Sequence, residues 1–81
     1  MPRSEGLIVA KLEEAKIEEL WIFVKEHLAN EDFITNRRIR QKTGISYDEA
    51  ISFFNRMIDV NRLVRLGKGV NTHYVLVDQN R

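Results

Sequence analysis

Hydrophobic residues recur at three- and four-residue intervals in the first third of the chain. Ile17, Leu20, Val24 and Leu28 fall on one face of a helix under this spacing, with charged residues on the other side. Neither glycine nor proline occurs between residues 7 and 29. The pattern therefore predicts one long helix over about residues 7–29, with this apolar face turned toward a core.

The same segment carries a second set of apolar residues, more than one small core normally needs. Surplus apolar surface on a small protein marks an interface, and closed dimers are the commonest oligomers. We therefore expect a homodimer with the following residues at or near its interface: Ile8, Leu12, Ala15, Trp21 and Ile22. The alternative is that this second set covers the end of the domain's own core.

A short second helix is predicted over about residues 36–43. Thr35 or Asn36 is a suitable N-cap, and Gly44 supplies the left-handed residue that ends a helix. Ile39 is the one obvious core contact inside this segment. The other side chains are left mostly for solvent or a ligand.

A third helix is predicted over about residues 47–60. Ser46, followed three residues later by Glu49, is typical of a capping box. Asn61 tolerates the left-handed conformation and is the expected exit from the helix. The apolar positions at helical spacing are Ala50, Phe54, Met57 and Ile58, with Ile51 and Phe53 on the flanks.

Two runs of strand-forming residues, 63–66 and 73–77, lie near the C-terminal end. The loop that joins them contains two glycines, so the pattern predicts an antiparallel hairpin over about residues 62–77. Phe33-Ile34 is a candidate for a further short strand. The predicted fold class is α+β, a single domain over residues 1–81 with three helices followed by a C-terminal hairpin.

Composition narrows the function classes. The chain has 81 residues, of which 43% are hydrophobic and 31% charged, as in a folded soluble domain with one small core. It has no cysteine, which excludes disulfides and thiolate zinc sites and favours a cytoplasmic location. No apolar stretch approaches the roughly 18 residues that a membrane span needs, so no membrane partner is expected.

Charge is unevenly distributed along the chain, although the net charge is only +1. Residues 5–34 contain three lysines and eight acidic residues. Residues 35–72 contain eight basic and three acidic residues. A pole of positive charge on a small domain is typical of proteins that bind polyanions.

The order of these elements resembles the winged helix-turn-helix family of DNA-binding proteins, over roughly residues 17–77. The most specific piece is residues 33–46, which end in the turn Thr43-Gly44-Ile45-Ser46. In the family such a turn joins a supporting helix to the recognition helix. The resemblance implies that residues 47–60 are the recognition helix, that residues 62–77 form the wing, and that the protein regulates transcription by binding specific duplex sequences.

A helix presented by a tight turn fits the major groove of DNA, where Arg reads guanine and Asn reads adenine. The candidates on the third helix and its cap are Ser46, Tyr47, Ser52, Asn55 and Arg56. The candidates for phosphate contacts on the preceding helix are Arg37, Arg38 and Lys42, and those at the hairpin tip are Lys68 and Asn71. The alternatives for Arg56 are salt bridges to Asp59 or Asp48. Arg62 and Arg65 are expected to pair with acids of the first helix.

A protein-interaction module of a replication or transcription assembly is the alternative function. The near-neutral net charge favours it, and so do Ile51, Phe53, Asp48 and Glu49 in a helix that would enter DNA. The sequence offers no nucleophile with a base to activate it, no metal-ligand spacing around His27 or His73, and no phosphate loop. We therefore expect no enzymatic activity, no metal and no cofactor.

Overall fold

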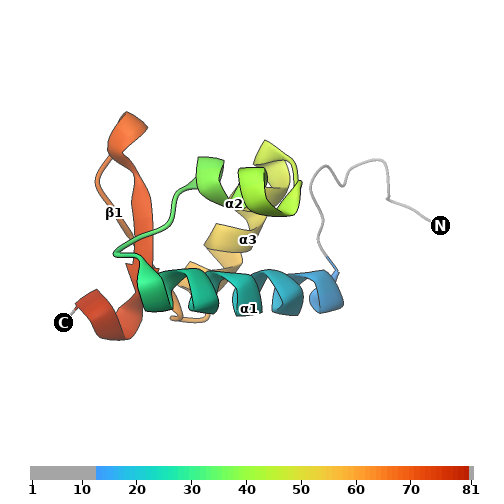
Figure 1. The fold of residues 1–81 in the computed structure, drawn as a ribbon, viewed down its shortest axis with the longest axis horizontal. Helices are drawn as coiled ribbons and strands as arrows, with labels where there is room; N and C mark the ends of the chain where they lie inside the picture. The colour runs from blue at the N-terminus through green and yellow to red at the C-terminus, as the bar shows by residue number, and fades with distance from the viewer. Residues whose placement is uncertain (1–12, 81) are drawn as a thin grey trace.

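The computed structural model describes residues 13–80, which form three helices followed by a two-stranded antiparallel hairpin (Figure 1). The elements are α1 (Glu14–Asn30), α2 (Asn36–Thr43), α3 (Tyr47–Asp59), β1 (Leu63–Leu66) and β2 (His73–Leu76). Short 3-10 turns, η2 (Gly69–Asn71) and η3 (Val77–Asn80), follow the two strands. The predicted α+β class is confirmed, and the layout is compatible with a winged helix.

Helix α1 begins later than predicted. Glu13 has an extended backbone (φ −79°, ψ 155°) and is the N-cap, so the helix starts at Glu14. The predicted helix over residues 7–29 is therefore wrong at residue 13, which is not helical. Residues 7–12 lie outside the described part of the chain. Among the described residues of α1, Ile17 is the first that is buried.

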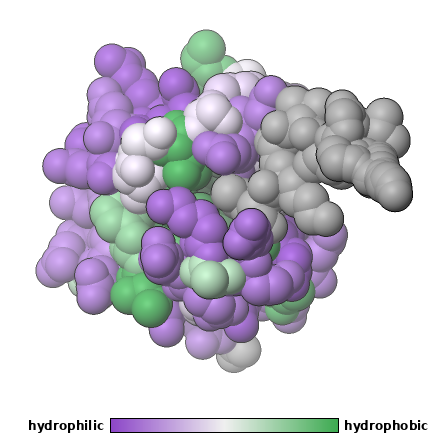
Figure 2. Space-filling view, turned by 90° about the vertical axis from the view of Figure 1, so that its right-hand side faces the viewer, coloured by the Kyte–Doolittle hydropathy of each residue, from purple (hydrophilic) through white to green (hydrophobic). Residues whose placement is uncertain are grey.

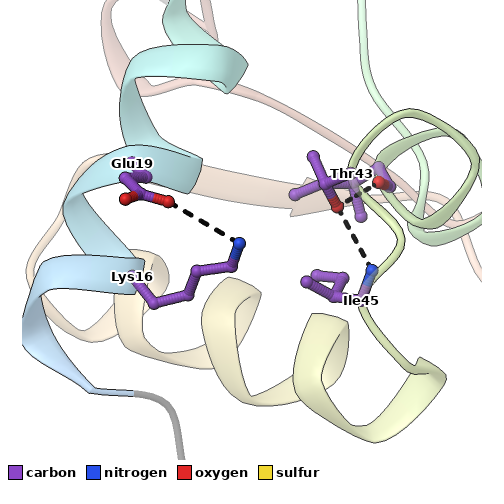
Figure 3. A network of polar contacts seen from close by, with 5 residues as sticks. Lys16, Glu19, Thr43 and Ile45 are labelled. Atoms are coloured by element: carbon purple, nitrogen blue, oxygen red, sulfur yellow. Dashed lines mark hydrogen bonds and ion pairs between the residues drawn. The ribbon is translucent and has the colours of Figure 1, made fainter.

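The ends of α2 are those the sequence predicts. Thr35 is the N-cap, since its Oγ1 accepts a hydrogen bond from the backbone N–H of Arg38 at 3.1 Å. Gly44 ends the helix in the left-handed region at φ 81°. Thr43 then links the helix to the turn: its hydroxyl donates to the Ile39 carbonyl at 2.6 Å and accepts from Ile45 N–H at 3.5 Å (Figure 3).

Helix α3 is capped at both ends. At its start Ser46 Oγ accepts from Glu49 N–H at 3.0 Å, and the Glu49 carboxylate accepts from Ser46 N–H at 2.9 Å, which confirms the capping box. At its end Asn61 has φ 63°, as expected of an exit residue. Asn61 and Arg62 donate their N–H groups back to Ile58 and Met57, the two hydrogen bonds of a Schellman motif. This motif directs the chain from α3 into β1.

The hairpin pairs Leu63 with Leu76 and Leu66 with His73. On its other edge β2 forms a bridge to Ile34, in which the N–H and C=O of Tyr74 bond those of Ile34. The short strand predicted at Phe33-Ile34 is therefore confirmed as a single bridge.

The core lies between α1, α3 and the hairpin. The Phe54 and Tyr74 rings stack in parallel at 3.8 Å and join α3 to β2. Phe53 is completely buried, which corrects the prediction that it lies on an exposed flank. The reason is that neighbouring elements cover α3 over a wider arc than its apolar periodicity indicates. The largest fully buried side chains are Phe53, Phe54, Leu20, Leu28, Ile34, Ile39, Met57, Leu63 and Val24.

In Figure 1, α1 runs along one side of the molecule, and the hairpin tip at η2 rises on the opposite side. The N-terminal end of α3 and the whole of α2 also lie on the side away from α1. The fold thus presents the tip, α2 and the start of α3 together.

Gly67→Ala tests the geometry of the hairpin tip, with Gly69→Ala as a matched control. Both glycines have positive φ (75° and 58°), so each alanine should cost about 1–2 kcal/mol for the left-handed conformation. A Cβ at Gly67 would also lie 2.3 Å from the Asn71 carbonyl oxygen, whereas a Cβ at Gly69 meets nothing within 4 Å. Urea unfolding should show the larger loss of stability for Gly67→Ala. Equal losses would contradict this packing.

Candidate nucleic-acid interface

Helix α2 carries four basic residues and no acidic one. Arg37, Arg38 and Lys42 are exposed, and none of them forms an ion pair with another residue in the described range. Their charges are therefore available to a ligand.

Arg38 and Lys42 line an open depression of about 450 Å³ between α2 and the end of α1. His27, Glu31 and Asp32 also line it. The two carboxylates offset the two cations locally, so Arg37, which does not line this depression, is the less compensated cation of the three.

The hairpin tip adds a second group of exposed residues. Lys68 and Asn71 are exposed, and Val70 between them is fully exposed. Asn71 and Val70 line a second depression of about 390 Å³ together with Phe33 and Thr35. Phe33 and Thr35 also line the first depression, so the two depressions are neighbours on the surface.

Four of the five residues predicted on α3 and its cap occupy its free side or its free end. Tyr47 and Asn55 are exposed and Ser52 is half-buried. The Ser46 hydroxyl accepts from Glu49 N–H, which leaves its proton free to donate. These residues and the exposed Asp48 carry no positive charge.

Arg56 does not lie as the sequence predicts. Its Nη2 donates to Glu14 Oε2 of α1 at 2.8 Å, and its ion pair is neither with Asp48 nor with Asp59. Glu14 lies 42 residues away in the chain. The predicted guanine-reading role of Arg56 would require this ion pair to break.

Carboxylates of α1 form ion pairs with basic side chains outside α1. Arg62 contacts Glu18 at 3.8 Å, as predicted, and its guanidinium lies 5.1 Å from the centre of the Trp21 ring. The same prediction is wrong for Arg65, which is exposed and forms no ion pair with a described residue. Lys25 lies 5.6 Å from the Trp21 ring. Two cations therefore contact Trp21, which is also packed against the core.

Three of the five predicted dimer residues lie in the described part of the chain. Trp21 is half-buried, while Ala15 and Ile22 are exposed, Ile22 at 53%. Ile8 and Leu12 lie outside the described residues. On the face in Figure 2, where α1 begins, hydrophilic side chains of the described residues predominate and hydrophobic ones are scattered among them.

Arg40 and Asn36 were not among the predicted site residues. Arg40 Nε donates to Asn36 Oδ1 at 2.5 Å, and its guanidinium lies 5.5 Å from the centre of the Tyr47 ring. The spacing of Asn36 and Arg40, four residues apart on a predicted helix, was the available signal.

No described helix is long and apolar enough to cross a membrane. The sequence matches no protein-family model, and no curated protein or solved structure is significantly similar to it. The geometry of the described residues is therefore the basis for any functional conclusion.

A double-mutant cycle with Glu14→Gln and Arg56→Gln measures how firmly Arg56 is held. Both side chains are partly exposed, at 69% and 43%, so the coupling expected in urea unfolding is about 0.2–1 kcal/mol. It should fall as salt is added, because exposed ion pairs are screened. A coupling of zero at low salt would show that Arg56 is free for another ligand.

Proposed function

We propose that the protein is a winged-helix protein that binds duplex DNA, and that it acts as a transcriptional regulator. The observation that carries the proposal is the separation of charge in the fold. Carboxylates of α1 pair with Arg56 and Arg62, whereas the cations of α2 and the hairpin tip have no ion-pair partner among the described residues. In Figure 1, α2 and the hairpin tip lie on the side of the molecule opposite α1, and Arg38 and Lys42 also line the depression that α2 shares with the end of α1.

Phosphate contacts would supply most of the affinity. Arg37 and Arg38 stand at the start of α2, and Lys68 stands at the hairpin tip. A cation that neutralises a phosphate releases a counterion, so binding weakens as salt rises. In a winged helix these two regions flank the helix that enters the groove.

Base recognition would come from side chains of α3 other than Arg56. Asn55 is able to form two hydrogen bonds with adenine, and Ser52 donates or accepts with several bases. Asp48 on the same exposed side accepts from the amino group of cytosine. Guanine recognition by Arg56 would first require its exposed ion pair with Glu14 to break, at a cost of about 0.2–1 kcal/mol.

Arg37→Ala tests the phosphate contacts, with Lys25→Ala as a control that removes the same charge from α1. Arg37→Ala should weaken binding to all duplexes alike and lower the slope of log K against log salt by about 1. Lys25→Ala should change neither quantity measurably. Fluorescence anisotropy across a salt series checks both. Equal effects of the two variants would show that binding depends on the net charge of the protein and not on the position of Arg37.

A protein-interaction module remains the second candidate, because α3 has a mixed surface. Its one cation, Arg56, is paired, and its exposed side includes Asp48, Asp59 and the half-buried Ile51. Phe53 no longer supports this candidate, since it belongs to the core. Failure of the wild-type protein to bind any duplex at low salt would favour this function over DNA binding.

We propose further that the protein forms a homodimer through the exposed side of α1 that carries Ala15 and Ile22. Ile22→Glu should yield a particle of half the wild-type mass in equilibrium sedimentation at micromolar concentration, because it places a charge in each copy's interface. The substitution should leave the fold intact, since Ile22 is 53% exposed. A wild-type protein that is already monomeric would contradict the proposal.

A further inference from the structure

Arg40 differs from the other cations of α2 because its guanidinium is held from two sides. Its Nε donates to Asn36 Oδ1 at 2.5 Å, one turn earlier on the same helix. Its guanidinium carbon lies 5.5 Å from the centre of the Tyr47 ring, which belongs to the first residue of α3. Arg40 is half-buried, whereas Arg37 and Lys42 are exposed. Little conformational freedom is left for Arg40 to lose when it binds a ligand.

The Asn36 amide is oriented to accept from Arg40, and this orientation leaves its own Nδ2 without a hydrogen bond in the described part of the chain. Its oxygen faces Arg40, and its Nδ2 is buried without a hydrogen-bond partner among the described residues. A buried N–H without a partner is unfavourable and calls for an explanation. Turning the amide over would place Nδ2 against the guanidinium, which has only donors. Holding Arg40 therefore fixes the orientation of Asn36.

The hydrogen bond to Asn36 uses only one of the five N–H donors of Arg40. The two terminal amino groups, Nη1 and Nη2, form no ion pair with a described carboxylate. A planar guanidinium with two free amino groups matches two oxygens of a phosphate. Neither of the two acids that begin α3 pairs with these amino groups. The Glu49 carboxylate accepts from the Ser46 N–H, and Asp48 lies about 100° further round the helix than Tyr47.

We propose that Arg40, oriented by Asn36 and Tyr47, is a preorganised contact for one phosphate of the nucleic-acid backbone at the junction of α2 and α3. The inference rests on the proposed DNA binding and adds a phosphate contact to it. Tyr47, expected from the sequence to contact DNA itself, supports the guanidinium with its ring in this arrangement. Asn36 and Tyr47 are positioning residues, and Arg40 makes the contact.

Arg40→Lys is the deciding substitution, because lysine keeps the charge but has no planar fork and cannot reproduce the Asn36 contact. It should weaken duplex binding by roughly tenfold, the scale of one charge-assisted hydrogen bond. Arg62→Lys is the matched control, since Arg62 also lies over an aromatic ring, Trp21, but belongs to the α1 side. It should leave duplex affinity unchanged.

Substitutions at the two positioning residues distinguish positioning from general damage. Tyr47→Ala should weaken binding about as much as Arg40→Ala, the double variant should lose little more, and Tyr47→Phe should lose less because a ring remains. Asn36→Ala should weaken binding with little change in the melting temperature, because removal of the unpartnered N–H offsets the loss of the hydrogen bond to Arg40. A merely structural role would lower the melting temperature and the affinity together.

The outcomes are separable by one set of anisotropy titrations and thermal melts. If the wild-type protein binds duplex DNA and Arg40→Lys binds equally well, the inference is overturned and the proposed function stands. Additive losses for Arg40→Ala and Tyr47→Ala would also overturn it. If the wild-type protein binds no duplex at any salt concentration, the proposed function and this contact both fall. Arg40→Ala is not needed for the decision if it fails to fold, because Arg40→Lys and Asn36→Ala report on the same contact.

Discussion

Tyr74 connects the parts of the chain that the proposed interface needs. Its ring stacks in parallel on Phe54 of α3 at 3.8 Å, with 4° between the ring planes. Its backbone bonds Ile34 in both directions, which fixes the segment that leads into α2. Its strand also pairs with β1. One buried residue therefore sets the positions of α3, the hairpin and the start of α2 relative to one another.

This arrangement determines which charges remain available. Glu14 and Glu18 of α1 lie within reach of Arg56 and Arg62, so these two cations are held in ion pairs. Helix α2 lies on the other side of the molecule, and its one buried side chain is Ile39. Its remaining positions carry the basic residues. The asymmetry of charge along the sequence thus becomes an asymmetry in space for α2 and the hairpin tip, whereas α3 itself has more acidic than basic residues.

The sequence was informative where the deciding interaction is local. The Ser46–Glu49 capping box, the Thr35 cap and the left-handed Gly44 and Asn61 each depend on neighbours a few residues away, and all were predicted. Among contacts between distant elements, the pairing of Arg62 with an acid of α1 was predicted, but most others were not. The burial of Phe53 and the Arg56–Glu14 pair, 42 residues apart, depend on how α1 and the hairpin close around α3. The Arg40 guanidinium over Tyr47 likewise depends on the angle between α2 and α3, which periodicity does not specify.

An NMR titration of the ¹⁵N-labelled protein with a short duplex at low salt tests the central claim most directly, because it reports on every element at once. The account predicts shifted backbone amides in α2, in the first two turns of α3 and at residues 67–72, together with a shifted Arg40 Nε–H signal. Amides in the middle of α1 should stay unchanged. Shifts concentrated on α1, or no shifts at all, would contradict the account.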